Sequence, residues 1–210
     1  MKHIKPYAKI YDDINGQDIL KKIEACGRIC YKSEHKICEG SAEKLVANLI
    51  KRSHEAMLEH VSVTVKFVVD RGISHEIVRH RLASFSQEST RYCNYLKDDF
   101  DNEITCITPF YLADDADGFV AWESAMRACE ISYFKMLELG YTAQEARAVL
   151  PNSLKTELMM TANLREWRHF FKLRAANSTG MAHPQMLEVT VPLLEEFKQK
   201  IPVVFDDIQA

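Results

Sequence analysis

The sequence lacks any apolar run near the roughly 18 residues that a membrane span requires. Its first residues, Met1-Lys2-His3-Ile4-Lys5-Pro6, contain no apolar signal core either. These two absences predict a cytoplasmic protein with no membrane partner. The chain also has no repeat, no low-complexity tract and no Gly/Ser-rich linker, so we expect a single domain over residues 1–210, long enough for a substantial core.

An excess of positive charge is missing as well. The chain has 27 Lys and Arg against 30 Asp and Glu, which gives a formal net charge of −3. Domains that bind nucleic acid usually carry a clear surplus of basic residues. We therefore expect no nucleic-acid partner.

The six cysteines form no Cys-x-x-Cys pair. Cys26 and Cys30 are one helical turn apart and His35 and Cys38 follow, but these spacings match no familiar zinc pattern. In a chain of this size without a signal peptide, reduced thiols are favoured over disulfides. We predict that most of the cysteines are buried, reduced thiols and that the chain has no metal site.

The hydrophobic periodicity predicts an α+β fold, in which helices pack against a modest, mainly antiparallel sheet. Apolar residues at three- and four-residue spacing predict helices over 16–32, 41–50, 74–78, 118–139, 142–151, 163–174 and 185–200. Strands are predicted at 61–67, 104–111 and 156–162.

Several helix ends carry residues that typically cap a helix. Ser41 and Ser74 are predicted N-caps, and Gly140 is a predicted C-terminal stop. Thr142 with Glu145, and Asn163 with Glu166, have the spacing of capping boxes.

The densest group of chemically active side chains lies between Arg79 and Tyr92. Arg79, Arg81 and Arg91 occur there with His80 and several hydroxyl residues. Guanidinium groups this close repel one another unless an anion lies among them, and their planar donors fit phosphate and carboxylate. A charge run is often only a solvated turn. Because apolar residues interrupt this one and an apolar strand precedes it, we predict an anion site.

A second group follows at 163–174. A helix that begins at Asn163 presents free amides and a positive dipole end to an anion, and Arg165 and His169 share one face of it. Trp167 and Phe171 are interpreted as core residues. Arg147, which precedes an apolar run, fits snorkelling and ligand binding equally well.

In order and spacing, these segments resemble the flavin-dependent thymidylate synthases (the ThyX family). The signature is Arg-His-Arg at 79–81, followed by Ser89, Arg91 and Tyr92. The resemblance extends over about residues 20–200 through further segments, namely His54-Glu55-Ala56-Met57-Leu58-Glu59-His60, Arg147–Pro151, Asn163–Trp167, His169–Arg174 and His183-Pro184-Gln185-Met186.

The resemblance implies one thymidylate synthase domain over 1–210 and a methyltransferase that makes dTMP from dUMP. FAD would be the cofactor, and NADPH and 5,10-methylenetetrahydrofolate would be co-substrates. It also implies a homotetramer whose subunits share active sites. Gln87 stands where many family members have glutamate, so it can form hydrogen bonds but cannot act as an acid or base.

The resemblance also assigns the site residues. FAD would contact Ala56, Arg79, His80, Arg81, Gln87, Asn163, Leu164, Arg165 and His169. The residues implied for dUMP are Glu76, Ile77, Val78, Arg79, Gln87, Glu88, Ser89, Thr90, Arg91, Arg147 and Arg174. Arg174 would be catalytic, because the family uses the matching arginine to polarise the pyrimidine and promote loss of its N3 proton.

The residues leave two other functions to consider, a hydrolase and an RNA-binding module. A hydrolase would use Ser84, Ser86 or Ser89 as nucleophile and His80 as base, but no nucleophile elbow is present and Gly72 is the only glycine nearby. A non-enzymatic RNA-binding module would use the basic and aromatic segment Arg79–Tyr95, and the net acidity of the chain weighs against it.

Overall fold

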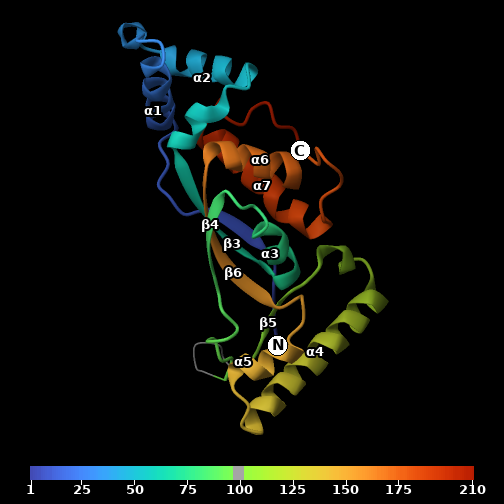
Figure 1. The fold of residues 1–210 in the computed structure, drawn as a ribbon. Coiled ribbons are helices and arrows are strands. Elements are labelled where there is room, and N and C mark those ends of the chain that lie inside the picture. The colour runs from blue at the N-terminus through green and yellow to red at the C-terminus, as the bar shows by residue number, and fades with distance from the viewer. Residues whose placement is uncertain (97–101) are drawn as a thin grey trace. The chain divides into compact units, whose positions relative to one another are not determined.

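The computed structural model describes residues 1–96 and 102–210 (Figure 1). Its helices are α1 (Gly16–Ile29), α2 (Ser41–Lys51), α3 (Arg71–Ile77), α4 (Ala116–Glu138), α5 (Ala143–Ala146), α6 (Leu164–Arg174) and α7 (Pro184–Lys200). Its strands are β1 (Lys2–Ile4), β2 (Tyr7–Ile10), β3 (Ser62–Asp70), β4 (Ala83–Gln87), β5 (Thr105–Ile107) and β6 (Lys155–Asn163). Short 3₁₀ helices connect some of them: η1 (Glu34–Lys36), η2 (Glu55–His60), η4 (Phe110–Leu112) and η5 (Arg147–Val149).

The larger sheet has four strands in the order β2-β3-β6-β4, and a separate pair joins β1 to β5 in parallel. The predicted α+β class with an antiparallel sheet is confirmed. In β6 every second residue is buried, from Thr156 to Ala162, as expected for a strand with one face in the core. Among the described residues, no helix is both long enough and apolar enough to cross a membrane.

Two compact units can be distinguished in the chain. The first unit comprises Met1–Tyr7, Phe67–Arg79 and Ser86–Leu158, and the second comprises Ala8–Lys66, His80–Phe85 and Met159–Ala210. The prediction of a single domain over 1–210 stays a prediction.

The core of the first unit forms along α4. Tyr133 and Met126 are buried on this helix and pack with Tyr95, Ile104 and Leu154. Burial raises the pKa of the Tyr133 hydroxyl. This face of α4 is the apolar face that the sequence predicts.

The core of the second unit is aromatic. The indole of Trp167 stacks against Phe171 at 5.7 Å between ring centroids and lies 5.1 Å from the ring of Phe197. Its N–H donates a hydrogen bond of 3.0 Å to the carbonyl of Val63. The interpretation of Trp167 and Phe171 as core residues is confirmed, and α6, which carries them, packs beside α7 (Figure 1).

Two of the predicted N-caps are wrong. Gly40, with φ +71°, caps α2, while Ser41 lies in the first turn and its hydroxyl donates to Glu24. Asp70 caps α3 and accepts a hydrogen bond of 2.8 Å from the amide of Ile73. Because β3 continues to Asp70, the helix begins earlier than predicted and Ser74 falls inside it.

Other predicted ends are confirmed. Thr142 and Glu145 form a capping box at α5, and Gly140 follows α4 with φ +92°. The helix at 16–32 is shorter than predicted and ends at Ile29.

The strands β1, β2 and β4 were not predicted. The exposed hydroxyls of Ser84 and Ser86 gave β4 too little apolar character, although its alternating burial follows the strand period. The prediction that most cysteines are buried is also wrong. All six are free thiols, of which Cys106 is buried and Cys30 and Cys38 are exposed.

Candidate functional site

In the second unit, two predicted site residues, His80 and Arg174, meet Glu166 in a short polar chain. His80 lies just before β4, and Glu166 and Arg174 come from the first and last turns of α6. The Nδ1 atom of His80 is 3.1 Å from Oε1 of Glu166, and Nε of Arg174 donates to Nε2 of His80 at 3.3 Å. The side chains of His80 and Glu166 are buried.

The surroundings of His80 keep its imidazole neutral. Burial lowers its pKa, and the nearby cation of Arg174 and ring of His169 lower it further. The hydrogen bond to Glu166 acts in the opposite direction but does not outweigh them. A neutral imidazole has one N–H donor and one acceptor nitrogen. The two contacts therefore have opposite polarity: Nδ1–H donates to the carboxylate, and Nε2 accepts from the guanidinium.

This arrangement corrects one sequence prediction. Asn163 caps α6 as predicted, since its Oδ1 accepts a hydrogen bond of 2.9 Å from the amide of Glu166. Glu166 does not complete the capping box, because its carboxylate turns to His80. Glu166 was not predicted as a site residue, and no pattern close to it in the sequence could have indicated His80 as its partner.

His80, Glu166 and His169 form the one group of three among the described residues that could hold a metal ion, with ligand atoms within 4.8 Å of one another. Both nitrogens of His80 already have hydrogen-bond partners in the structure. A metal ion would also lie close to the guanidinium of Arg174, and like charges repel. We therefore interpret the group as a hydrogen-bonded chain.

The remaining residues predicted for FAD in the second unit are mostly exposed. Arg165 and His169 are exposed on α6, and Arg165 pairs with Glu59 at 2.6 Å. Ala56 is exposed in η2, and Arg81 is exposed beside His80. Leu164 differs, because its side chain is buried in the core and its amide donates to the carbonyl of Val61.

These exposed groups fit a flavin dinucleotide. The guanidinium groups of Arg165 and Arg81 suit a diphosphate, and the imidazole of His169 offers a flat polar surface. The positive dipole end at the N-terminus of α6 also favours an anion.

In the first unit, the orientation of the Gln87 side chain is determined by two hydroxyls. Its Nε2 donates to Ser74 at 2.9 Å and to Thr156 at 3.2 Å. The hydroxyl of Ser74 itself donates to the carbonyl of Arg71, so it must accept from the amide nitrogen of Gln87. The carbonyl oxygen of Gln87 is then the group that can bind a ligand.

Glu88 takes part in a charged cluster beside β6. Its Oε2 accepts from Nζ of Lys155 at 2.9 Å and from the amide of Glu157 at 3.2 Å. Burial lowers the pKa of Lys155, but its hydrogen bonds to Glu157 and Glu88 outweigh this and leave the pKa raised. The carboxylate of Glu88 thus supports the strand, and a ligand would meet the other side chains of this segment.

Ser89, Thr90 and Arg91 form the turn after Glu88. The amide of Arg91 donates to the hydroxyl of Ser89 at 3.3 Å, and its Nε donates to Gln144 at 3.1 Å. The guanidinium carbon lies 5.2 Å from the centre of the Tyr92 ring. Arg91 is held at the surface, with the rest of its fork directed at solvent or ligand.

Thr90, in this turn, lines a cavity of about 270 Å³ together with three basic side chains. These are Arg71, His75 and Arg147, and the wall is completed by Ala148, Leu150, Pro151, Asn152 and Leu154. The volume is slightly below the roughly 300–1,000 Å³ of most ligand sites, so it suits a phosphate with part of a sugar. The sequence did not indicate Arg71 and His75, since both lie outside the segments that resemble the family.

The other residues predicted for dUMP in this unit lie on or just after α3. The side chain of Ile77 is fully buried in the core, whereas Val78 and Arg79 are exposed. Glu76 is half-buried.

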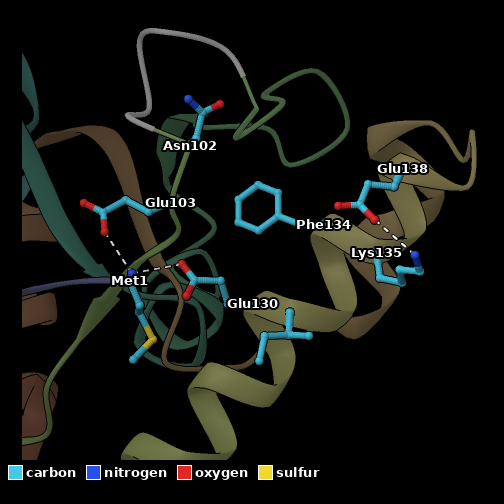
Figure 2. A pocket seen from close by; sticks show the side chains of 8 residues that line it. Met1, Asn102, Glu103, Glu130, Phe134, Lys135 and Glu138 are labelled. Carbon is cyan, nitrogen blue, oxygen red and sulfur yellow. Dashed lines mark hydrogen bonds and ion pairs between the residues drawn. The ribbon is translucent and has the colours of Figure 1, made fainter.

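A larger cavity of about 600 Å³ in the first unit contains none of the predicted residues. Figure 2 shows the amine of Met1 between Glu103 and Glu130, at 2.8 and 3.1 Å. Burial lowers the pKa of this amine, but its hydrogen bonds to the two carboxylates outweigh this and leave it raised. The wall also contains Glu138, which pairs with Lys135 at 3.1 Å. Three carboxylates against two cations leave the cavity slightly negative, which disfavours a phosphate, so we place the candidate site elsewhere.

Comparison with known proteins gives consistent results. Residues 14–203 match the family described as thymidylate synthase complementing protein. The chain is 31% identical over 192 residues to a flavin-dependent thymidylate synthase of Geobacter sulfurreducens, which covers 88% of this chain and 80% of that protein. It is 32% identical over 179 residues to one of Pyrococcus furiosus, covering 85% of this chain and 69% of that protein.

Among solved structures, the UMP/dUMP methylase PolB from Streptomyces cacaoi, bound with 5-Br dUMP, is similar to this chain with a TM-score of 0.81. The similarity covers 98% of this chain and 96% of that chain at 21% sequence identity. It shows that the two proteins share a fold.

Proposed function

Because the chain belongs to the flavin-dependent thymidylate synthase family and is a methyltransferase, we propose that it converts dUMP to dTMP. The one-carbon donor is 5,10-methylenetetrahydrofolate, and NADPH is the reductant through FAD. The observation that carries the proposal is the family match over residues 14–203, which confirms the resemblance inferred from the motifs. The arrangement of basic side chains supports the same function.

The phosphate of dUMP binds in the first unit. Arg147 and Thr90 line the cavity of about 270 Å³, and Ser89 and Arg91 belong to the same turn as Thr90. Guanidinium groups and hydroxyls are the donors that a nucleotide monophosphate needs. Arg71 and His75 join this set because they line the same cavity.

FAD would be held by residues at the start of α6 and in the other segments that resemble the family. These are Ala56, Arg79, His80, Arg81, Gln87, Asn163, Leu164, Arg165 and His169, of which His80 and Leu164 are buried. When bound, FAD supplies the redox chemistry of the reaction. Leu164 contributes through its backbone, since its side chain is buried. Arg165 binds once its pair with Glu59 opens, which is inexpensive because both side chains are about half exposed.

Arg174 is the catalytic residue. A guanidinium directed at a pyrimidine carbonyl stabilises negative charge as it develops and favours loss of the N3 proton, without itself gaining or losing a proton. The contact of Arg174 with the buried His80 limits the motion of its Nε. Gln87 offers a carbonyl oxygen as a hydrogen-bond acceptor and performs no proton transfer.

The residues proposed for dUMP are divided between the units, since Arg174 belongs to the second and the others to the first. We propose that the protein is a cytoplasmic homotetramer in which different subunits complete one another's sites.

The test begins with purified protein and added FAD. We expect flavin absorbance that remains after gel filtration, a mass by light scattering about four times that of the 24.2 kDa chain, and dTMP formation that requires dUMP, methylenetetrahydrofolate and NADPH together. Omission of each co-substrate is the control. A flavin-loaded monomer would remove the shared-site proposal, and failure to make dTMP with all components present would remove the proposed reaction.

A further inference from the structure

We propose that Glu166 is a positioning residue for the reaction: it determines the tautomer of His80, and His80 in turn holds the guanidinium of Arg174. The inference rests on the proposed function of Arg174 at the pyrimidine. It concerns a side chain to which the family resemblance assigns no role.

The polarity of the hydrogen bonds carries the argument. A carboxylate only accepts hydrogen bonds, so Nδ1 of His80, 3.1 Å from Glu166, must carry the proton. The neutral ring then has its lone pair on Nε2, where Nε–H of Arg174 donates at 3.3 Å. The other tautomer would place two N–H groups against each other on the Arg174 side and leave the Glu166 side with a lone pair against a carboxylate.

Burial strengthens the preference of His80 for this tautomer. His80 is 5% exposed and Glu166 is 7% exposed, so water cannot replace either partner easily. The rings of Phe170 and His169 lie 4.9 and 5.8 Å from the His80 ring in edge-on contacts. They restrict the plane of the imidazole. Glu166 therefore selects the tautomer.

The chain of hydrogen bonds also predicts how acid affects Arg174. The titratable and charged groups around His80 are Glu166, Arg174 and His169. When His80 becomes protonated, Nε2 acquires a hydrogen and a positive charge faces the guanidinium. Arg174 then loses Nε2 of His80 as an acceptor and is repelled by the imidazolium. Since the pKa of His80 lies below the ordinary value of 6.5, this loss occurs on the acid side of that value and the arrangement is intact at neutral pH.

The first experiment compares Glu166→Gln with Glu195→Gln, which makes the same change on an exposed helix position of the same unit. Gln is isosteric with Glu but can donate as well as accept, so it no longer imposes one tautomer. With dUMP saturating, we expect kcat to fall about 10- to 100-fold in Glu166→Gln, because a small displacement of a catalytic group has an effect of this size. Glu195→Gln should match the wild type.

A direct measurement of the tautomer separates positioning from general structural support. Nitrogen-15 spectra of histidine-labelled protein without nucleotide should show His80 with Nδ1 protonated in the wild type and a mixture of tautomers in Glu166→Gln. Wild-type protein with Nε2 protonated would overturn the inference, whether or not the protein makes dTMP. A Glu166→Gln variant with the wild-type tautomer and the wild-type kcat would also overturn it.

The wild-type protein provides a test that does not depend on folding of a variant. The pKa of His80 from the same spectra, recorded with dUMP bound, should coincide with the acid limb of the pH profile of kcat. A kcat that stays constant through the titration of His80 would contradict the inference. Absence of dTMP synthesis by the wild type would instead contradict the proposed function and leave the tautomer measurement to decide the inference.

Discussion

Glu166 and Arg168 are two residues apart on α6, and both are buried in the second unit, yet their charges are balanced differently. The guanidinium of Arg168 forms a bidentate pair with Asp207 at 2.6 and 2.7 Å, reaches Glu55 at 3.0 Å and contacts the carbonyl of Val204. Glu166 has a neutral imidazole as its partner, in a chain that ends at the half-buried Arg174. In the first group opposite charges are paired directly, and in the second a neutral ring lies between the carboxylate and the guanidinium.

The pKa values express the same difference. Burial lowers the pKa of Arg168, but Asp207 and Glu55 outweigh this and raise it, and Arg168 lowers the pKa of Asp207. These charged forms stabilise each other, so this cluster supports the fold. At His80 the balance favours the neutral form. The comparison indicates that buried charges on α6 are balanced in two ways, by opposite charges around Arg168 and by a neutral imidazole beside Glu166.

Removal of the ion pairs of Arg168 should have the largest effect on stability. Arg168→Met leaves Asp207 without this partner and Glu55 with only the ammonium of Lys172 at 3.9 Å. Because the side chain of Asp207 is 46% exposed, we expect a cost of about 3 kcal/mol in unfolding free energy, at the low end of the range for a broken buried pair. Thermal unfolding at fixed protein concentration measures it. Arg127→Met is the matched control, because it breaks an exposed pair with Glu123 that contributes about 0–1 kcal/mol. Equal melting temperatures for the two variants would contradict the structural role of Arg168.

The difference in unfolding free energy between the wild type and Arg168→Met should depend on pH with a definite sign. The pKa of Asp207 in the folded protein is lower than its ordinary value of 3.8. Its stabilising contribution is therefore present above pH 3.8 and is lost as the pH falls through the folded pKa. The difference in unfolding free energy between the wild type and Arg168→Met should become smaller as the pH falls below that value.

The substitution Arg174→Lys tests the hydrogen-bonded group of Glu166, His80 and Arg174. The variant should retain the fold and the flavin but lose turnover. A point charge on a flexible stem cannot replace a planar fork held by His80, and loss of one stabilising donor costs about 10²–10³ in rate. The rate of flavin reoxidation with dUMP and methylenetetrahydrofolate, after prior reduction, isolates this step from NADPH binding. A rate near that of the wild type with dUMP saturating would mean that Arg174 only supports the structure.

A smaller effect is expected from Arg91→Ala in the first unit. Arg91 is exposed and bonded to Gln144 by Nε, so its loss should affect ligand binding and leave stability unchanged. We expect dUMP to bind more weakly by about 1.5–3 kcal/mol, the range for a hydrogen bond to a charged group. Deoxyuridine, which lacks the phosphate, is the control ligand and should bind as before. Equal weakening of both would show that Arg91 does not face the phosphate.

The smallest effect on stability concerns the N-cap of α6, the helix that carries Glu166, Arg168 and Arg174. Asn163→Ala removes the N-cap of α6 and should cost about 0.5–2 kcal/mol of stability, or about 2–4 °C in melting temperature for each kcal/mol. Asn15→Ala removes a similar cap from α1 and should cost as much without changing kcat. A decrease in flavin affinity seen only in Asn163→Ala would sharpen the distinction between a cap and a binding residue.

Much of the fold and the family can be predicted from neighbouring residues. The helices at α4 and α7 and the strand β6 follow from apolar spacing, and the capping box of Thr142 and Glu145 depends on groups within a single turn. Arg79, His80, Arg81 and Arg174 were predicted from motifs of short, fixed spacing. These features depend on local geometry, which a linear pattern contains.

Other features depend on contacts between distant segments. His80 and Glu166 are 86 residues apart, and local rules predicted a capping box where burial instead favours the imidazole as partner of the carboxylate. Arg71 lines the same cavity as Arg147 only because the chain returns to that place. The sequence by itself determined the family and most helices. Tertiary structure alone decided which buried charges pair with one another, because desolvation and long-range packing select the partner that spacing cannot identify.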